Sequence, residues 1–162
     1  ESLDSPNLHI LPSNIDLVGA ELEMISLPDR EKLLRKTIET LDRNVVILAS
    51  GGLSHRFWPL RDFAKHESSS LENIRTPEAR KADEEVIELW ESGNHEAVID
   101  FYPEYRTYAP EGFFGHYLIM AGALGGRLCE AEGEKYSDYE SAAGTGQVHM
   151  WFDRPEDGWT KS

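Results

Sequence analysis

Residues 45–57 of the chain, VVILASGGLSHRF, join an apolar run to a glycine turn and a histidine. The aliphatic run Val45–Ala49 is bounded by Asn44 and by Ser50-Gly51-Gly52, which predicts a strand covered on both faces, as in a parallel sheet. Ligands of open α/β sheets bind beyond the carboxyl ends of such strands. Glycines at this place let the backbone approach a ligand closely. We therefore expect His55 at the carboxyl end of a central strand, with its ring at a cleft.

The histidine in this turn has two interpretations. An imidazole titrates near neutral pH and suits general acid/base catalysis, so His55 is a candidate catalytic residue. In the alternative, His55 only makes hydrogen bonds within a loop. The local pattern does not separate the two.

Composition limits the class of protein. The 162 residues include 30 acidic and 16 basic side chains, for a formal net charge of −14, which disfavours partners with phosphate groups such as nucleic acid and anionic lipid. The longest apolar run, Tyr117–Leu124, is far shorter than the roughly 20 residues of a membrane span. A single cysteine, Cys129, excludes an internal disulfide. No signal peptide is recognised, so we expect a cytoplasmic protein.

Periodicity predicts an α/β fold. Residues 8–49 predict a strand, two helices and a second strand parallel to the first. Thr76-Pro77 is typical of a helix start, with Thr76 as the N-cap. The apolar stripe of that helix comprises Ala79, Ala82, Val86, Leu89 and Trp90. We expect a single three-layer α/β domain, a mostly parallel sheet with helices on both faces.

Segments downstream of the glycine turn resemble one enzyme family. They are ADEEVIELWESGNHEAVIDFYPEY (residues 82–105), Glu111-Gly112 with the apolar segment 118–125, and GTGQV (residues 144–148). Together with the strand, the turn and His55 they resemble the LigB-type (class III) extradiol ring-cleavage dioxygenases, especially the homoprotocatechuate 2,3-dioxygenase branch. The resemblance covers about residues 40–153, and the combination is more specific than any one segment.

The resemblance implies a chemistry and a set of site residues. Such enzymes open catechol rings with ferrous iron held by two histidines and one carboxylate. By resemblance His55 matches the acid/base histidine and Glu111 the carboxylate ligand. The residues that the resemblance places near the substrate are Ser54, Arg56, Gly144, Thr145 and Gln147.

The histidine ligands of the iron are not found in this way. In the family they lie upstream of the segments matched here, and this chain has no counterpart of that part. His9 and His116 are not in a ligand motif, and His66 and His95 are in polar surroundings. A homo-oligomer or a partner chain would then have to supply the two histidines. Glu111 also has a second interpretation, as a carboxylate favoured by the dipole at a helix start.

The first part of the chain resembles a different family. Residues 8–17, LHILPSNIDL, with Gly19-Ala20-Glu21, resemble a βα segment of the ParA/Soj partitioning ATPases. The sequence lacks the G-x-x-x-x-G-K-[ST] phosphate loop, so we expect no nucleotide cofactor. The chain thus divides into a ParA-like segment (1–42), a dioxygenase-like part (43–153) and a tail (154–162), all within one domain.

Two classes of function follow. The chain is either the carboxyl-terminal part, or a relative, of a non-haem iron extradiol dioxygenase, or a recombined, truncated or designed module that keeps the fold without a complete iron site. A nucleotide-binding function is disfavoured for want of a phosphate loop. Iron content discriminates between the first two.

Overall fold

The structure is a computed structural model that describes residues 35, 36, 38, 40, 45–156 and 158–160 of the chain. The strand-helix-helix-strand unit expected over residues 8–49 lies mostly outside the described residues, as do His9 and nearly all of the ParA-like segment. In the part that is described, no helix is long and apolar enough to cross a membrane.

The described chain contains α-helices, 3-10 turns and short strands. The α-helices are α3 (Pro77–Glu91), α4 (His95–Tyr105) and α5 (Gly115–Leu124). The 3-10 turns are η2 (Phe63–Lys65), η3 (Leu71–Asn73), η4 (Arg106–Tyr108), η5 (Glu111–Phe114) and η6 (Gly126–Leu128). The strands are β1 (Gly133–Lys135), β2 (Glu140–Ala142), β3 (Thr145–Gln147) and β4 (Met150–Phe152).

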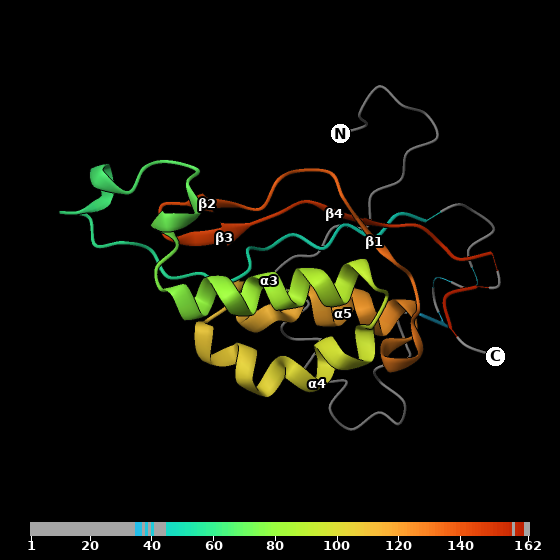
Figure 1. The fold of residues 1–162 in the computed structure, drawn as a ribbon. Helices are drawn as coiled ribbons and strands as arrows, with labels where there is room; N and C mark the ends of the chain where they lie inside the picture. Colours follow the sequence, from blue (N-terminus) through green and yellow to red (C-terminus); the bar gives the residue numbers. More distant parts are fainter. Residues whose placement is uncertain (1–34, 37, 39, 41–44, 157, 161–162) are drawn as a thin grey trace.

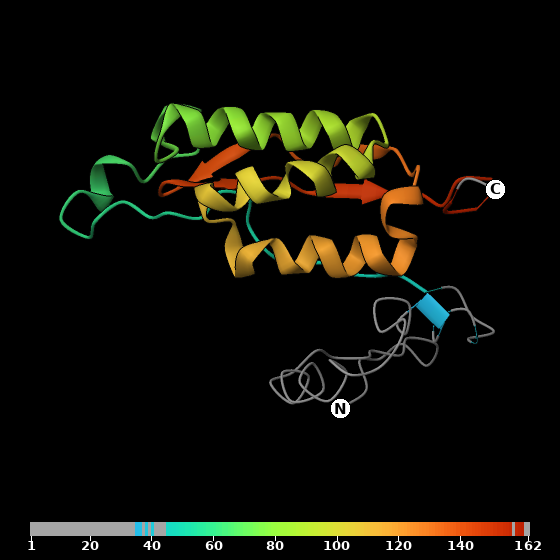
Figure 2. The ribbon, with the colours of Figure 1, turned by 90° about the horizontal axis from the view of Figure 1, so that it is seen from below.

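These strands form two separate antiparallel pairs. β1 pairs with β4, with Glu134 opposite Trp151, and β2 pairs with β3, with Ser141 opposite Gly146. Helices α3, α4 and α5 lie on the same side of the strands (Figure 1 and Figure 2). The described residues therefore form a small domain of mixed helices and strands. They do not confirm the three-layer arrangement, because they contain neither a parallel pair nor helices on both faces.

The segment Val45–Ala49, which was predicted as a central strand, is not part of a sheet in the described structure. Val46 and Leu48 are 71% and 89% exposed, whereas Ile47 and Ala49 pack against the core. A strand also needs a hydrogen-bonded neighbour, and Val45–Ala49 has no backbone hydrogen bond to another described residue. The prediction of a strand covered on both faces is wrong, because a continuous apolar run does not reveal that only alternate residues meet the core.

Helix α3 confirms the prediction made from its first residues. The hydroxyl of Thr76 accepts a hydrogen bond from the amide of Ala79 at 3.1 Å, and Pro77 occupies the first turn. One face of the helix is buried through Ala79, Ala82, Asp83, Val86, Ile87 and Trp90.

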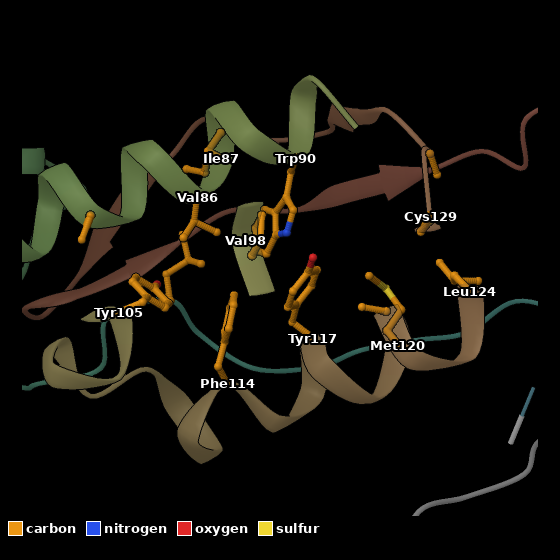
Figure 3. Close-up of a cluster of buried hydrophobic side chains, with 14 residues drawn as sticks. Val86, Ile87, Trp90, Val98, Tyr105, Phe114, Tyr117, Met120, Leu124 and Cys129 are labelled. Atoms are coloured by element: carbon orange, nitrogen blue, oxygen red, sulfur yellow. The ribbon is translucent and has the colours of Figure 1, made fainter. Parts of the chain in front are cut away.

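The core lies between this face and helix α5 (Figure 3). The Trp90 ring is the centre of an aromatic cluster, with its centroid 5.2 Å from that of Tyr117 and 5.9 Å from that of Phe114. Tyr105, at the end of α4, is fully buried beside Phe114. Large rings removed from water on α3, α4, η5 and α5 supply much of the driving force that holds the helices together.

His95 is a core residue, and the expectation that it lies in polar surroundings is wrong. Its side chain is fully buried at the start of α4. Nε2 lies 2.8 Å from the carbonyl oxygen of Ala131, and Nδ1 lies 2.9 Å from the hydroxyl of Tyr117. Because a carbonyl only accepts, Nε2 donates and Nδ1 accepts from Tyr117, which is the pattern of a neutral ring. Burial lowers the pKa of His95, and the hydrogen bond with Ala131 opposes this.

The cap of α3 is directly testable. Thr76→Ala removes the hydroxyl that accepts from Ala79, so we expect the free energy of unfolding to fall by about 1 kcal/mol. Urea unfolding followed by circular dichroism measures this. The control is Ser70→Ala, because Ser70 precedes η3 without a side-chain capping bond; it should cost less than about 0.5 kcal/mol. Equal losses in the two variants would contradict the assignment.

Neutral His95 predicts a dependence of stability on pH. The unfolded chain binds a proton below about pH 6.5, whereas the buried ring resists it, so the folded state loses stability as the pH falls below that value. The slope should approach about 1.4 kcal/mol per pH unit. The His95→Gln variant should have a lower free energy of unfolding, but this free energy should depend less on pH between about pH 6.5 and the pKa of His95 in the folded state. Urea unfolding at a series of pH values measures the slopes; parallel curves for the two proteins would refute the prediction.

Candidate functional site

Two segments far apart in the sequence meet at the glycine turn. The amide of Gly52 donates a hydrogen bond of 2.6 Å to Oε2 of Glu111. The same carboxylate oxygen lies 3.8 Å from Nδ1 of His55. The structure thus brings together the candidate acid/base residue and the candidate carboxylate ligand.

Antiparallel backbone pairing holds this arrangement. The amide of Glu111 points to the carbonyls of Gly52 and Leu53, each at 3.3 Å, and the amide of His55 donates to Ala109 at 3.1 Å. Ser54 forms an isolated bridge with the residue before Glu111. The relative position of the two side chains is therefore fixed by main-chain bonds and not by the side chains alone.

The chain immediately after Glu111 is strained. Gly112, Phe113 and Phe114 have φ angles of 55°, 54° and 64°. Bulky side chains rarely adopt this left-handed region, which costs about 1–2 kcal/mol per residue. Phe114 is fully buried in the core, so its packing helps to hold the conformation. Strain of this kind often accompanies a functional site.

The His55 ring has an unpaired nitrogen. Nδ1 is buried and has no hydrogen-bond partner in the described structure. Its distance of 3.8 Å from Glu111 is within the range of an ion pair but too long for a hydrogen bond. The ring packs edge-on against Phe57, with centroids 4.9 Å apart. An unpaired buried nitrogen costs free energy, so the arrangement favours a ligand or water as its partner.

The two glycines make room for further side chains. A Cβ at Gly52 would lie 2.7 Å from Nε2 of Gln147 and 2.9 Å from Nδ1 of His55, and a Cβ at Gly51 would collide with the ring of His116. Burial lowers the pKa of His116, and the charge of Glu111 opposes this. Sequence spacing set His116 aside because it is not in a ligand motif, yet the structure places it at the turn.

Other predicted site residues lie elsewhere. Ser54 is buried and donates its hydroxyl to Asp83, while Arg56 is exposed and donates to the carbonyl of Thr107 at 3.0 Å. Side chains of an extended segment alternate, so Ser54 and Arg56 leave the backbone on the face opposite to His55. The Gly144 amide faces Ser141.

Thr145 and Gln147 connect the last predicted segment to the site. Thr145 is buried, and its hydroxyl donates to the carbonyl of Ala142 at 2.9 Å. The same hydroxyl accepts from Nε2 of Gln147 at 2.9 Å. Thr145 therefore holds the amide of Gln147, which reaches the glycine turn.

Asp83 is a residue that the sequence did not single out. It stands beside Glu84 and Glu85 at the start of an acidic helix face, so its residue type gave no signal. In the structure its carboxylate is fully buried and accepts hydrogen bonds from Ser54, Tyr105 and Tyr139. Burial raises the pKa of Asp83, and these hydrogen bonds oppose the rise.

The described residues do not fit a complete metal site. Over residues 45–156 and the few others described, no three His, Cys, Asp or Glu side chains are grouped so that they could hold a metal ion. Glu111 offers one carboxylate, already engaged by the amide of Gly52. An iron site of two histidines and a carboxylate would need ligands beyond these.

Comparison with known proteins shows the family to which the chain belongs. The chain is 38% identical over 92 residues to 3,4-dihydroxyphenylacetate 2,3-dioxygenase of Escherichia coli, a match that covers 56% of this chain and 32% of the relative. The chain thus spans about a third of the length of that enzyme. Residues 32–153 match the family described as the catalytic LigB subunit of aromatic ring-opening dioxygenase, and the chain belongs to this LigB family.

Proposed function

We propose that the chain supplies the acid/base histidine and one carboxylate of an extradiol dioxygenase site that opens catechol rings. The observation that carries this proposal is the meeting of His55 and Glu111 at the Gly52 turn in a member of the LigB family. The substrate proposed is a catechol of the 3,4-dihydroxyphenylacetate class, after the name of the E. coli relative.

The role of His55 is proton transfer. The His55 side chain is 24% exposed, and in this proposal its imidazole accepts a proton from a catechol hydroxyl. The proton returns to the ring-opened product, and both atoms of dioxygen enter that product. Oε2 of Glu111 lies 3.8 Å from Nδ1 of the same ring, so the two side chains face one reaction space in the proposal.

The metal of this proposal is ferrous iron. It would supply open coordination positions for the catecholate and dioxygen. Since the described residues do not complete such a site, we propose that the other ligands come from outside them, through another part of the chain or a partner. The buried free thiol of Cys129 agrees with a cytoplasmic location, which is also part of the proposal.

A second candidate function rests on the incomplete ligand set. A module that keeps the fold of the family without its chemistry would also have a carboxylate and a histidine, with no group of three ligands in the part that the structure describes. Iron content and ring opening separate it from the enzyme.

We expect the isolated chain to bind ferrous iron weakly and to open catechol rings slowly or not at all. Water would fill most coordination positions around a metal held by one carboxylate. The test is to incubate the chain with ferrous iron without oxygen, measure the bound metal, then add air and 3,4-dihydroxyphenylacetate and follow the yellow product. Strong yellow colour would show that the chain itself completes the site.

His55→Ala should abolish ring opening while iron stays bound. The assay combines the chain with a partner chain that supplies two histidine ligands. A lost general base costs about 10²–10⁴-fold in rate. His149→Ala is the control, because His149 is exposed. An active His55→Ala protein, or one that loses its iron, would refute the acid/base role.

Gly52→Ala tests the crowding of the turn. The added Cβ would displace Gln147 and His55, so we expect the free energy of unfolding to fall by about 1–3 kcal/mol and ring opening in the combined assay to fall by about 10²-fold. Gly115→Ala is the matched control, because nothing lies within 4 Å of its new Cβ. If both variants behave alike, the turn is not crowded as the structure indicates.

A further inference from the structure

Asp83 is a buried carboxylate with four hydrogen-bond donors. Oδ1 lies 2.9 Å from the amide of Ser54 and 2.7 Å from the hydroxyl of Tyr105. Oδ2 lies 2.7 Å from the hydroxyls of Ser54 and Tyr139. Each oxygen thus accepts two bonds, which uses the full acceptor capacity of an ionised carboxylate.

A buried charge is a costly way to stabilise a core. Its transfer from water is unfavourable unless every lone pair is satisfied, and an apolar side chain of similar size often serves stability as well. Asp83 has no ion pair with a lysine, arginine or histidine in the part of the chain that the structure describes. The carboxylate therefore calls for an explanation beyond packing.

The partners of Asp83 indicate that explanation. Two of its four bonds go to Ser54, the residue directly before His55, and they hold both its amide and its side chain. The neighbouring backbone is paired with Gly146: the amide of Leu53 donates to the carbonyl of Gly146, and the amide of Gly146 donates to the carbonyl of Ser54. A Cβ at position 146 would collide with Oδ2 of Asp83, so a larger residue there would have to displace the carboxylate.

We propose that Asp83 is a positioning residue for the pair formed by His55 and Glu111. By holding Ser54 from the face opposite to His55, it fixes the rotation of the backbone between Gly52 and His55. That rotation aims the Gly52 amide at Glu111 and brings the His55 ring beside the same carboxylate. The catalytic meaning of this arrangement rests on the proposed function, whereas its geometry does not.

The test compares Asp83→Asn with Tyr139→Phe in the full chain. Asparagine keeps the size of the side chain but loses the charge and half of the acceptor capacity. Tyr139→Phe removes a donor to the same carboxylate and leaves both bonds to Ser54. The readout is the Gly52 amide in NMR spectra, since its short hydrogen bond to Glu111 gives a proton shifted downfield and slow to exchange.

In Asp83→Asn we expect the Gly52 amide to move upfield and to exchange about tenfold faster, relative to the Val98 amide of α4, as a lost hydrogen bond of about 1.4 kcal/mol allows. A loss of global stability speeds exchange at both amides, so the ratio of the Gly52 rate to the Val98 rate does not depend on it. In Tyr139→Phe the Gly52 signal should stay within about twofold of the wild-type rate. An unchanged signal in Asp83→Asn, or equal changes in both variants, would overturn the proposal.

Two further arms keep the test decisive. If Asp83→Asn does not fold, Ser54→Ala removes one of the bonds on the turn and should shift the Gly52 amide in the same direction; no shift overturns the proposal. In the combined assay, Asp83→Asn should lower kcat by about 10–10²-fold with KM little changed. If the wild-type chain opens no rings in the combined assay, only the proposed function is contradicted, and the NMR comparison still decides the role of Asp83.

Discussion

The site depends on the antiparallel pairing of residues 52–55 with residues 109–111. These segments are separated by helices α3 and α4 in the sequence, and their main-chain bonds close the loop between them. The entropy of closing so long a loop must be offset by burial, which the aromatic cluster around Trp90 and Phe114 provides. Core packing and site geometry are therefore not independent, because Phe114 follows Glu111 by three residues and is fully buried.

The sequence predicted those features of the fold that depend on neighbouring residues alone, such as the start of helix α3. The start of α3 follows from the hydroxyl of Thr76 and the fixed φ of Pro77, and the buried stripe follows from helical spacing. The same reasoning failed for Val45–Ala49, since the exposure of a strand depends on its neighbours, and these are set by the fold as a whole. A run of aliphatic residues does not show whether one or both faces of the extended segment are covered by other parts of the protein.

The candidate site was predictable only in part. The glycine turn indicated His55 as a site residue, but spacing alone did not connect it with Glu111, 56 positions later in the sequence; that link came from the family resemblance. Asp83 gave no signal, because one buried aspartate in a run of acidic residues looks like its exposed neighbours. Its burial is a property of the tertiary contacts with Tyr105 and Tyr139.

The candidate site in the described part of the chain lies beside an exposed apolar segment. His55 and Glu111 meet at the glycine turn, whereas the described residues contain no group of three side chains that could hold a metal ion. The same segment that presents His55 also exposes Val46 and Leu48. Exposed aliphatic side chains are unfavourable in water, and so is a buried Nδ1 that has no partner among the described residues.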